Sequence, residues 1–455
     1  MLDDPTAVDA GLLASGFGSV EVARLTSWPD RVERMLQVER ELAAAQAELG
    51  LIPADAAAEI ATTCRPENVD LAELAGRAAR AATPVIPLVA AVRDAASASG
   101  GAAGAAYLHH GVTSQDLVDT AMVLQVRDAL DHLDAQLARI ADRLASLATE
   151  HRDDPAVGRT LLQQTAPVTL GLRFAHWLAA IDRRRRRLAT LRPDLAVLQF
   201  GGVVGTLSVY GDHGPALARR LAERLGLGAP TLAWHTERDR VVDLAGSLAA
   251  VVSVVSKVAG DLVLLAQTEV GEVAEAPAGA TSSAVPHKRN PVNATASRAA
   301  CRLASGEIAA VMHAGDAELE RAAGAWQSEW VSVPGMLVRV GGAVERLGDA
   351  FEALQVDAGR AAQHLAEGDG LVASELLMAA LVESLGRPQA QSLVAEVAAR
   401  VREQGSNLHQ VAQAEPRITD VLSQERLAQV TDPLAASGVA GRLVDETLAE
   451  VPRDR

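Results

Sequence analysis

The feature that most constrains this chain is the segment 236–275, which contains no proline and is strongly apolar over 244–256. A helix of that length would extend for about 60 Å, at 1.5 Å per residue. It would be longer than a small domain is wide, and its apolar surface needs other helices around it. The segment therefore predicts an elongated bundle of long helices that is shared between subunits.

Other segments also have the character of helices. Apolar residues recur every three or four positions over 29–50, which is helical spacing. We predict further helices at 114–149, 167–191, 213–225, 293–315 and 334–353. Almost no stretch alternates apolar and polar residues with the period of a strand, so we expect an all-α fold. Turns divide it into an N-terminal helical domain (1–111), a central long-helix bundle (112–353) and a C-terminal helical domain (354–455).

Composition excludes several classes of function. Aromatic residues make up 2% of the chain, too few for a stacking surface for single-stranded nucleic acid. The net charge of −16 disfavours nucleic acid and anionic membranes as partners. Cys64 and Cys301 are too few for a disulfide framework. The acidic N-terminus MLDDPTAVDAG is unlike a signal peptide, and we expect a cytoplasmic protein.

Polar groups are concentrated in 279–291, GATSSAVPHKRNP. Small residues are followed there by histidine, lysine, arginine and asparagine, between two long apolar segments. This pattern is typical of a loop that closes over an anion. An ordinary basic surface loop has the same composition, and the residue chemistry alone does not separate the two interpretations.

The residue patterns of three segments resemble the signature regions of the fumarase/aspartase superfamily. SSAVPHKRNP (282–291) resembles the loop pattern GSSxMPxKxNP. HHGVTSQD (109–116) resembles the HxGxTSxD region, and GRTLLQ (158–163) resembles the GRTxxQ region. The three segments occur in the order found in that superfamily and span most of the middle of the chain.

The resemblance implies a homotetramer with a twenty-helix core and active sites built by three subunits. It implies that a proton leaves or joins the carbon next to a carboxylate, while a group departs from or adds to the neighbouring carbon. Ser282 matches the catalytic serine that handles this proton. His109 matches a candidate acid of adenylosuccinate lyases, with a merely packed histidine as the alternative.

The substrate implied by the resemblance is a small polycarboxylate, held by cations and hydrogen-bond donors that suit an enolate-like dianion. The matching substrate-binding positions are Thr113, Ser114, Gln115, Thr160, Gln163, Lys288, Asn290 and Arg321. No metal or organic cofactor is implied, because the chemistry needs only proton transfer and anion stabilisation.

Two positions depart from the fumarate-forming members. Those usually carry GRTHxQ and a glutamate shortly after the NP of the loop, where this chain has Leu161 and Thr295. A leucine cannot exchange a proton, so a lyase that uses this pair is disfavoured. Bacterial 3-carboxy-cis,cis-muconate cycloisomerases also lack the pair, and the chain resembles that branch along nearly its whole length, for example in WHTERDRV (234–241) and GAWQSEW (324–330). This implies lactonisation of a tricarboxylate muconate in the breakdown of protocatechuate.

Alternatives stay open at this point. Thr281 and Val285 replace a glycine and a methionine of the loop pattern. A β-elimination lyase that releases fumarate from an adenylosuccinate-like or nitrosuccinate-like succinate is therefore the second hypothesis. A catalytically silent relative is a third, disfavoured because Ser282, Lys288 and Asn290 are retained.

Two further patterns have structural interpretations. The glycine-rich run 201–205 lacks the βαβ setting of a nucleotide site and is expected to be a turn near the active site. The basic run 183–187 favours a solvated helix face or ion pairs between subunits.

Overall fold

The computed structural model describes residues 16–98, 100–276 and 288–451. Helices dominate these residues, with two short pairs of strands, which confirms the all-α fold class. The chain divides into two compact units. The first unit comprises Met1–Gln136, Arg184–Ser256 and Ala296–Glu345, and the second comprises Leu137–Arg183, Lys257–Thr295 and Arg346–Arg455.

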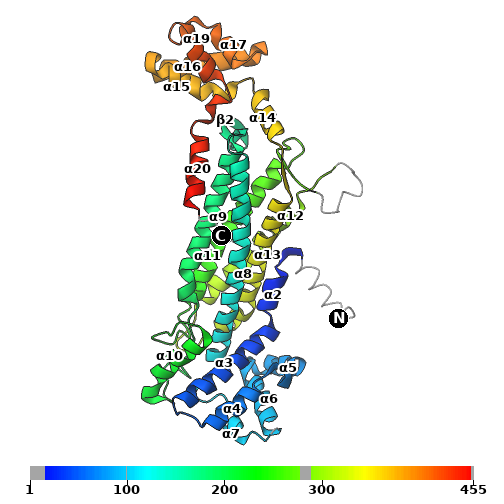
Figure 1. Cartoon of the computed structure of the whole chain (residues 1–455), viewed down its shortest axis with the longest axis vertical. Coiled ribbons are helices and arrows are strands. Elements are labelled where there is room, and N and C mark those ends of the chain that lie inside the picture. Colours follow the sequence, from blue (N-terminus) through cyan, green and yellow to red (C-terminus); the bar gives the residue numbers. More distant parts are fainter. Residues whose placement is uncertain (1–15, 99, 277–287, 452–455) are drawn as a thin grey trace. The chain divides into compact units, whose positions relative to one another are not determined.

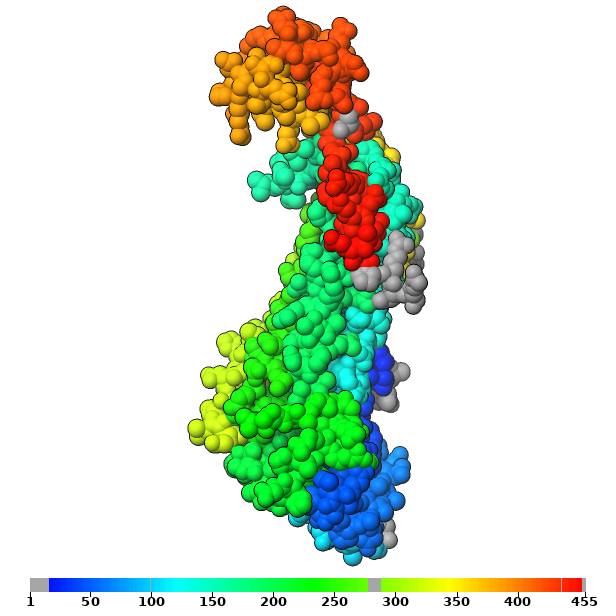
Figure 2. Space-filling model, turned by 60° about the vertical axis from the view of Figure 1, so that its left-hand side comes forward, coloured from blue at the N-terminus to red at the C-terminus, as the bar shows by residue number. Residues whose placement is uncertain are grey.

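A cluster of shorter helices lies in the first unit (Figure 1). Its members are α2 (Val20–Leu25), α3 (Trp28–Glu48), α4 (Ala54–Thr63), α5 (Leu71–Ala81), α6 (Val85–Ala98), α7 (Ala102–Tyr107) and α10 (Gly214–Leu225). The Ser27 hydroxyl caps α3 by accepting from the Asp30 N–H at 3.3 Å, and a proline in the first turn favours the helix start. α10 packs on α3, and Figure 2 shows green segments next to the blue N-terminal helices.

Five long helices supply most of the remaining core (Figure 1): α8 (Ser114–Glu150), α9 (Leu170–Leu195), α11 (Asp239–Leu265), α12 (Val292–Ala314) and α13 (Ala325–Glu352). In the first unit, α8 contacts α13 through His132 Nε2 and Glu345 Oε1 at 2.7 Å. In the second unit, the Trp177 ring of α9 packs against Phe351 of α13, with 6.1 Å between ring centroids. Each unit is therefore built from helix-on-helix packing.

The C-terminal helices form a small core of their own in the second unit. They are α14 (Ala358–Glu367), α15 (Ser374–Leu385), α16 (Arg387–Gln404), α17 (Leu408–Gln413), α18 (Pro416–Thr419), α19 (Gln424–Thr431) and α20 (Ala440–Glu450). Leu377, Leu381 and Val397 are fully buried at its centre. The strands β1 (Pro155–Thr160) and β2 (Gln163–Thr169) form an antiparallel hairpin that contacts α14 and α20.

Several predicted helix bounds were wrong. α11 ends at Leu265 rather than at 275, because the chain turns at Gly271 (φ +62°) and forms β3 (Val273–Glu275), which pairs with β4 (Leu354–Val356). α9 begins at Leu170 rather than at 167, because Pro167 belongs to β2. Prolines also lie inside α9 and α13, where only one backbone N–H is lost and the surrounding packing keeps the helix continuous.

By length and composition, α11 is also the one helix of the described residues that could cross a membrane. Within the chain, 44% of its most apolar window is buried. A core helix of a soluble bundle has the same composition, so this property alone does not indicate a membrane protein.

Candidate active site

A buried aspartate joins the start of α8 to the glycine-rich turn. Asp116 is 1% exposed, and its Oδ2 accepts from the backbone N–H groups of Thr113 (3.1 Å) and Gly202 (2.9 Å). Its Oδ1 accepts from the Gly201 N–H at 3.0 Å. A Cβ at position 201 would come within 2.4 Å of the Ala233 side chain, so only glycine allows this approach. Asp116 therefore determines where the 201–205 turn lies relative to the start of α8.

A histidine and a glutamine complete the surroundings of this carboxylate. Asp116 Oδ1 also lies 3.1 Å from Nε2 of His235 and accepts a hydrogen bond from the side-chain amide of Gln199 at 3.2 Å. His235 and Gln199 are both buried. A buried carboxylate is tolerated when hydrogen bonds satisfy its oxygens, and Asp116 meets that condition.

Gln115 is fully buried beside these groups. Its amide nitrogen donates to Asp119 Oδ2 (3.0 Å) and to the His235 carbonyl (2.7 Å), while its Oε1 has no partner among the described residues. Both amide hydrogens are therefore used inside the protein. Direct contact of Gln115 with a substrate carboxylate stays a prediction.

An ion-pair network supports the same region. Arg238, 1% exposed, donates through Nη1 to Asp119 Oδ2 at 2.7 Å and through Nε to Glu329 Oε1 at 3.0 Å. Trp326 Nε1 donates to the other Asp119 oxygen at 2.8 Å. Burial raises the pKa of Glu329, and Arg238 acts against that rise. The network connects α8 and α13 to the residue that precedes α11, and breaking one partner would leave a buried charge unpaired.

His109 lies in a loop between α7 and α8, in a left-handed conformation (φ +60°). Its Nδ1 is 2.6 Å from Glu39 Oε1, and its backbone N–H donates to Glu39 Oε2 at 3.2 Å. The Glu39 side chain is 4% exposed and the His109 side chain is 19% exposed. Burial of the ring acts to lower the pKa of His109, but the Glu39 carboxylate outweighs burial and the pKa is raised above its ordinary value.

The backbone after His109 is held in place by Tyr210 and Gln46. Gln46 donates to the His110 carbonyl at 3.0 Å and to the Tyr210 hydroxyl at 2.9 Å, and that hydroxyl donates to the same carbonyl. Gly111 (φ +76°) leaves no space for a side chain, since a Cβ would come within 2.5 Å of the Tyr210 ring. A Cβ on Gly202 would lie 3.2 Å from the Gly111 carbonyl, so the 109–111 loop touches the glycine turn.

The first unit therefore brings several predicted site residues to the glycine turn. Arg321 donates through Nη2 to the Val203 carbonyl at 2.9 Å, which places it beside the turn. Thr113 and Ser114 are half-buried at the start of α8, and their hydroxyls have no partner in the described part of the chain. His109 and Arg321 therefore lie beside the turn, and Thr113, Ser114 and Gln115 lie at the start of α8; that these residues bind a substrate stays a prediction.

The other predicted residues belong to the second unit. Thr160 and Gln163 are exposed and face each other across the β1–β2 hairpin, at the ends of its strands. Leu161 and Leu162 form the turn between them; both have positive φ (52° and 64°), and they are 96% and 68% exposed. Left-handed leucines are strained by about 1–2 kcal/mol each, so this tip is unusual for a solvated turn.

Lys288 and Asn290 are exposed just before α12. The buried Glu275 carboxylate caps that helix by accepting from the Asn293 and Ala294 N–H groups, both at 2.9 Å. The cap fixes where the segment after the loop joins the helix, and a helix N-terminus favours bound anions. Ser282 lies outside the described residues.

Arg159 of the GRTxxQ segment forms an ion pair inside the second unit. Its Nη2 donates to Glu272 Oε1 at 2.6 Å. The same carboxylate pairs with Arg173 Nη1 at 3.2 Å and with His364 Nδ1 at 2.9 Å. Burial acts to raise the pKa of Glu272, yet the hydrogen bonds from Arg159 and His364 hold that pKa below its usual value. This cluster attaches the hairpin to the second unit.

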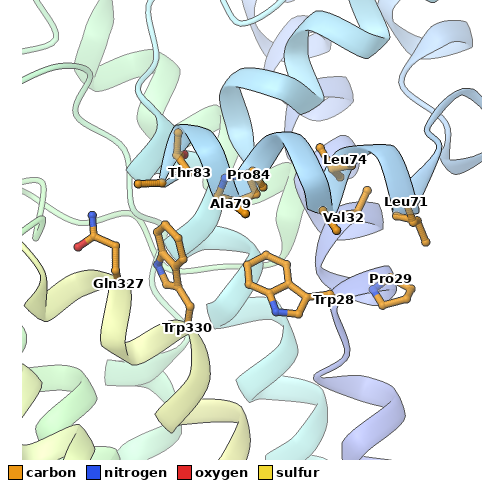
Figure 3. Close-up of a pocket in the computed structure, with 13 residues that line it drawn as sticks. Trp28, Pro29, Val32, Leu71, Leu74, Ala79, Thr83, Pro84, Gln327 and Trp330 are labelled. Atoms are coloured by element: carbon orange, nitrogen blue, oxygen red, sulfur yellow. The ribbon is translucent and has the colours of Figure 1, made fainter. Parts of the chain in front are cut away.

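A separate apolar cavity of 480 Å³ lies in the first unit between α3, α5 and the start of α13 (Figure 3). Trp28 and Trp330 face it together with Val32, Leu71 and Leu74. It contains none of the predicted site residues. An almost entirely apolar lining cannot compensate the charges of a polycarboxylate, so we do not assign the substrate to this cavity.

Sequence reasoning missed two residues of the first unit, Glu39 and His235, and did not predict the central role of Asp116. Asp116 is the last residue of the HxGxTSxD segment, so its pattern was available. Glu39 gave a weaker signal, as an acidic residue beside the apolar positions Val38 and Leu42 of a predicted helix. His235 is part of WHTERDRV and gave no signal for its contact with Asp116.

The chain is similar to known proteins over most of its length. Residues 26–306 match the family model described as Lyase, and residues 370–447 match the model described as Adenylosuccinate lyase C-terminus. The chain is 42% identical over 423 residues to the 3-carboxy-cis,cis-muconate cycloisomerase of Pseudomonas aeruginosa, covering 92% of each chain. It is 39% identical over 451 residues to the nitrosuccinate lyase of Streptomyces davaonensis, covering 97% of this chain and 95% of that one.

Solved structures show the same likeness. The 3-carboxy-cis,cis-muconate lactonizing enzyme from Pseudomonas putida superimposes with a TM-score of 0.90 at 39% identity, over 96% of this chain and 98% of that one. A fumarate lyase from Mesorhizobium superimposes with a TM-score of 0.88 at 35% identity, over 95% and 98% of the two chains.

Proposed function

Because this chain belongs to the fumarase/aspartase superfamily of enzymes, we propose that it is a cycloisomerase that converts 3-carboxy-cis,cis-muconate to carboxymuconolactone in protocatechuate degradation. The observation that carries the proposal is the paired departure at Leu161 and Thr295, which removes the histidine and the glutamate of fumarate-forming members. The similarity to cycloisomerases over most of the chain supports it.

The reaction requires a proton donor and groups that neutralise negative charge. One carboxylate oxygen of the substrate forms a bond to an alkene carbon, and the alkene electron pair moves toward the next carbon, which adjoins another carboxylate. That carbon then takes a proton. Three carboxylates are ionised at neutral pH and one becomes an ester, so the trianion takes up one proton and becomes a dianion. The enzyme must therefore supply a proton and neutralise negative charge.

We assign the proton transfer to Ser282 and His109. The Glu39 carboxylate raises the pKa of His109, which increases the protonated fraction of the ring relative to an ordinary histidine, and we assign to this ring the proton that lactonisation consumes. Charge on the carboxylates is balanced by Lys288 and Arg321. The remaining proposed substrate-binding residues are hydroxyl and amide groups: Thr113, Ser114, Gln115, Thr160, Gln163 and Asn290. The nucleophile and the alkene belong to one molecule, so binding in a bent conformation supplies much of the acceleration.

The proposed enzyme is a cytoplasmic homotetramer with active sites shared between subunits. The exposed leucines of the hairpin tip and the incompletely buried apolar helix α11 support an assembly, because large exposed apolar surfaces mark contact sites. The division into domains 1–111, 112–353 and 354–455 is part of the same proposal. No metal or organic cofactor is needed for the steps described.

The alternative is a lyase that expels a group from a substituted succinate, and the similarity to a nitrosuccinate lyase favours this second candidate. Nitrite leaves as a stable anion, so this reaction also dispenses with the missing histidine–glutamate pair. The two reactions differ in their proton balance. Elimination of nitrite releases one proton from carbon, whereas lactonisation takes one up.

The test measures ultraviolet absorbance and proton balance together in weakly buffered solution. With 3-carboxy-cis,cis-muconate we expect loss of diene absorbance with uptake of one proton per molecule converted. Nitrosuccinate, adenylosuccinate and argininosuccinate should release no measurable fumarate. Rapid fumarate formation from any of them, with an inert muconate, would overturn the proposal.

A further inference from the structure

We propose that Glu39 is a positioning residue for the reaction: it holds His109 in the orientation and protonation state in which the imidazole donates its proton. This inference rests on the proposed function, in which His109 supplies the proton. The pair consists of His109 and Glu39, a residue of α3. It differs from the histidine–glutamate pair of fumarate-forming members, whose positions Leu161 and Thr295 occupy in this chain.

The first observation is that Glu39 contacts His109 with both of its oxygens. Oε1 is 2.6 Å from the ring nitrogen Nδ1, and Oε2 accepts from the His109 backbone N–H at 3.2 Å. A carboxylate can only accept, so Nδ1 carries a hydrogen in both the neutral and the charged ring. The transferable proton is therefore on Nε2, which has no partner in the described part of the chain.

The second observation is that the backbone of His109 is strained into this arrangement. Its φ of +60° is uncommon for a residue with a side chain. The neighbouring carbonyl of His110 is fixed by Gln46 and Tyr210, so the loop has little freedom to relax. Strained backbone that the surroundings hold in place is a feature of functional sites. A histidine that only filled space would not need to donate two hydrogen bonds to one buried carboxylate.

The third observation concerns the charges around the ring. Glu39 of α3 and Asp116 of α8 act to raise the pKa of His109, while Arg93 of α6 and burial act to lower it. Tyr210 faces the same loop with a hydroxyl that is neutral at physiological pH, because burial raises its pKa. Glu39 makes the only direct contact with the ring among the charged groups described, so its removal leaves burial and Arg93 opposed by Asp116 alone.

The experiment compares the wild type with Glu39→Gln, which removes the charge and keeps the size. Histidine labelled with carbon-13 at Cε1 allows the pKa of His109 to be read by NMR without substrate, with His109→Asn identifying the signal. We expect a wild-type pKa above about 6.5 and a fall of about 1–3 pH units in Glu39→Gln. Glu59→Gln is the matched control, because Glu59 accepts from the Gly104 N–H at 2.6 Å in the same helical cluster.

Activity provides the second measurement. The alkaline limb of the kcat profile should move to lower pH in Glu39→Gln together with the pKa read by NMR. At high pH, kcat should fall by up to about tenfold for every pH unit that the limb moves. KM should change less, because Glu39 does not touch the substrate. Glu39→Asp, which keeps the charge, should recover part of the wild-type profile.

Two results would overturn the inference. One is a wild-type His109 that titrates at or below about 6.5, a result that needs no folded variant. The other is an equal fall of the pKa in Glu59→Gln and Glu39→Gln, which would indicate a general structural effect. If the NMR pKa values follow the expectation while muconate is inert, the proposed function fails and the pairing of Glu39 with His109 stands.

Discussion

One buried carboxylate determines how the 201–205 turn approaches α8. Asp116 accepts from three backbone N–H groups and two side chains, so every direction around its oxygens is occupied by a donor. An asparagine in its place would direct its amide N–H groups toward the N–H groups that donate to Asp116. The residue thus holds the region where Thr113 and Arg321 are proposed to bind substrate, without needing to contact substrate itself.

We predict that Asp116→Asn lowers the free energy of unfolding by about 2–3 kcal/mol, because the amide nitrogen leaves buried backbone donors unpaired. Chemical denaturation followed by circular dichroism measures this loss. Asp243→Asn is the control, since Asp243 is exposed on α11, and it should stay within about 0.5 kcal/mol of the wild type. Equal stability of the two variants would contradict the role assigned to Asp116.

The proposed catalytic serine lies outside the described residues and is testable by activity. We predict that Ser282→Ala abolishes turnover of muconate while the fold and the assembly persist, because a loop hydroxyl contributes chemistry rather than packing. Its neighbour Ser283 is the matched control, and Ser283→Ala should keep most of the activity. If Ser282→Ala stays within about tenfold of the wild type, equivalent to about 1.4 kcal/mol of activation free energy, then Ser282 is not the proton-transfer group.

Among the elements, the β1–β2 hairpin is the least expected in an otherwise helical chain. Its strands bury Ala156 and Val157, and the Arg159–Glu272 ion pair holds the first strand close to the turn. The tip has the opposite character, with two exposed leucines in the left-handed region. Such a turn favours asparagine and glycine in an isolated hairpin, so the leucines indicate a contact outside the single chain.

We predict that replacing the tip by Leu161→Asn and Leu162→Gly relieves the backbone strain and yet lowers activity at least tenfold, because the tip loses its apolar contact with a partner. Steady-state kinetics and light scattering on the same sample measure both effects. Asp369→Gly, at another left-handed position (φ +50°), controls for the relief of strain and should leave activity unchanged. A double variant with wild-type activity would show that the tip is only a turn.

At the scale of the whole molecule, α11 carries apolar and small side chains that the single chain leaves partly exposed, including Ala249, Ala250 and Val254. Small residues allow helices from different copies to approach closely. A free apolar helix of this length would promote aggregation unless it were covered, and a second copy of the same bundle is the natural cover.

We predict a homotetramer in solution, measured by multi-angle light scattering at micromolar concentration. Ala250→Glu should dissociate it, because the change places a charge in the proposed helix contact. Ala395→Glu, on an exposed position of α16, should leave the assembly intact. A stable wild-type monomer at that concentration would contradict both the assembly and the sharing of active sites between subunits.

Local periodicity was enough to predict the fold class and most long helices. The segments 29–50, 114–149 and 293–315 nearly coincide with α3, α8 and α12, because helix-forming spacing, caps and turns act over a few residues. The bounds were wrong at α9, where Pro167 belongs to the β1–β2 hairpin, and at α11, where residues 273–275 pair with the distant strand β4. The superfamily was also evident from the sequence, since its signature segments are contiguous.

Tertiary structure alone decided which charges meet. Glu39 reaches His109 from another helix, and Asp116 meets Gly201 and His235 far along the chain. No local pattern encodes these contacts, because they depend on how helices pack and on which carboxylates that packing buries. Burial and the Glu39 carboxylate then set the direction in which the pKa of His109 is shifted, which its own sequence segment does not determine. The sequence by itself therefore determined most of the helices and which chemical groups the chain contains. The packing of those helices decided that Glu39 meets His109 and that Asp116 meets the glycine turn.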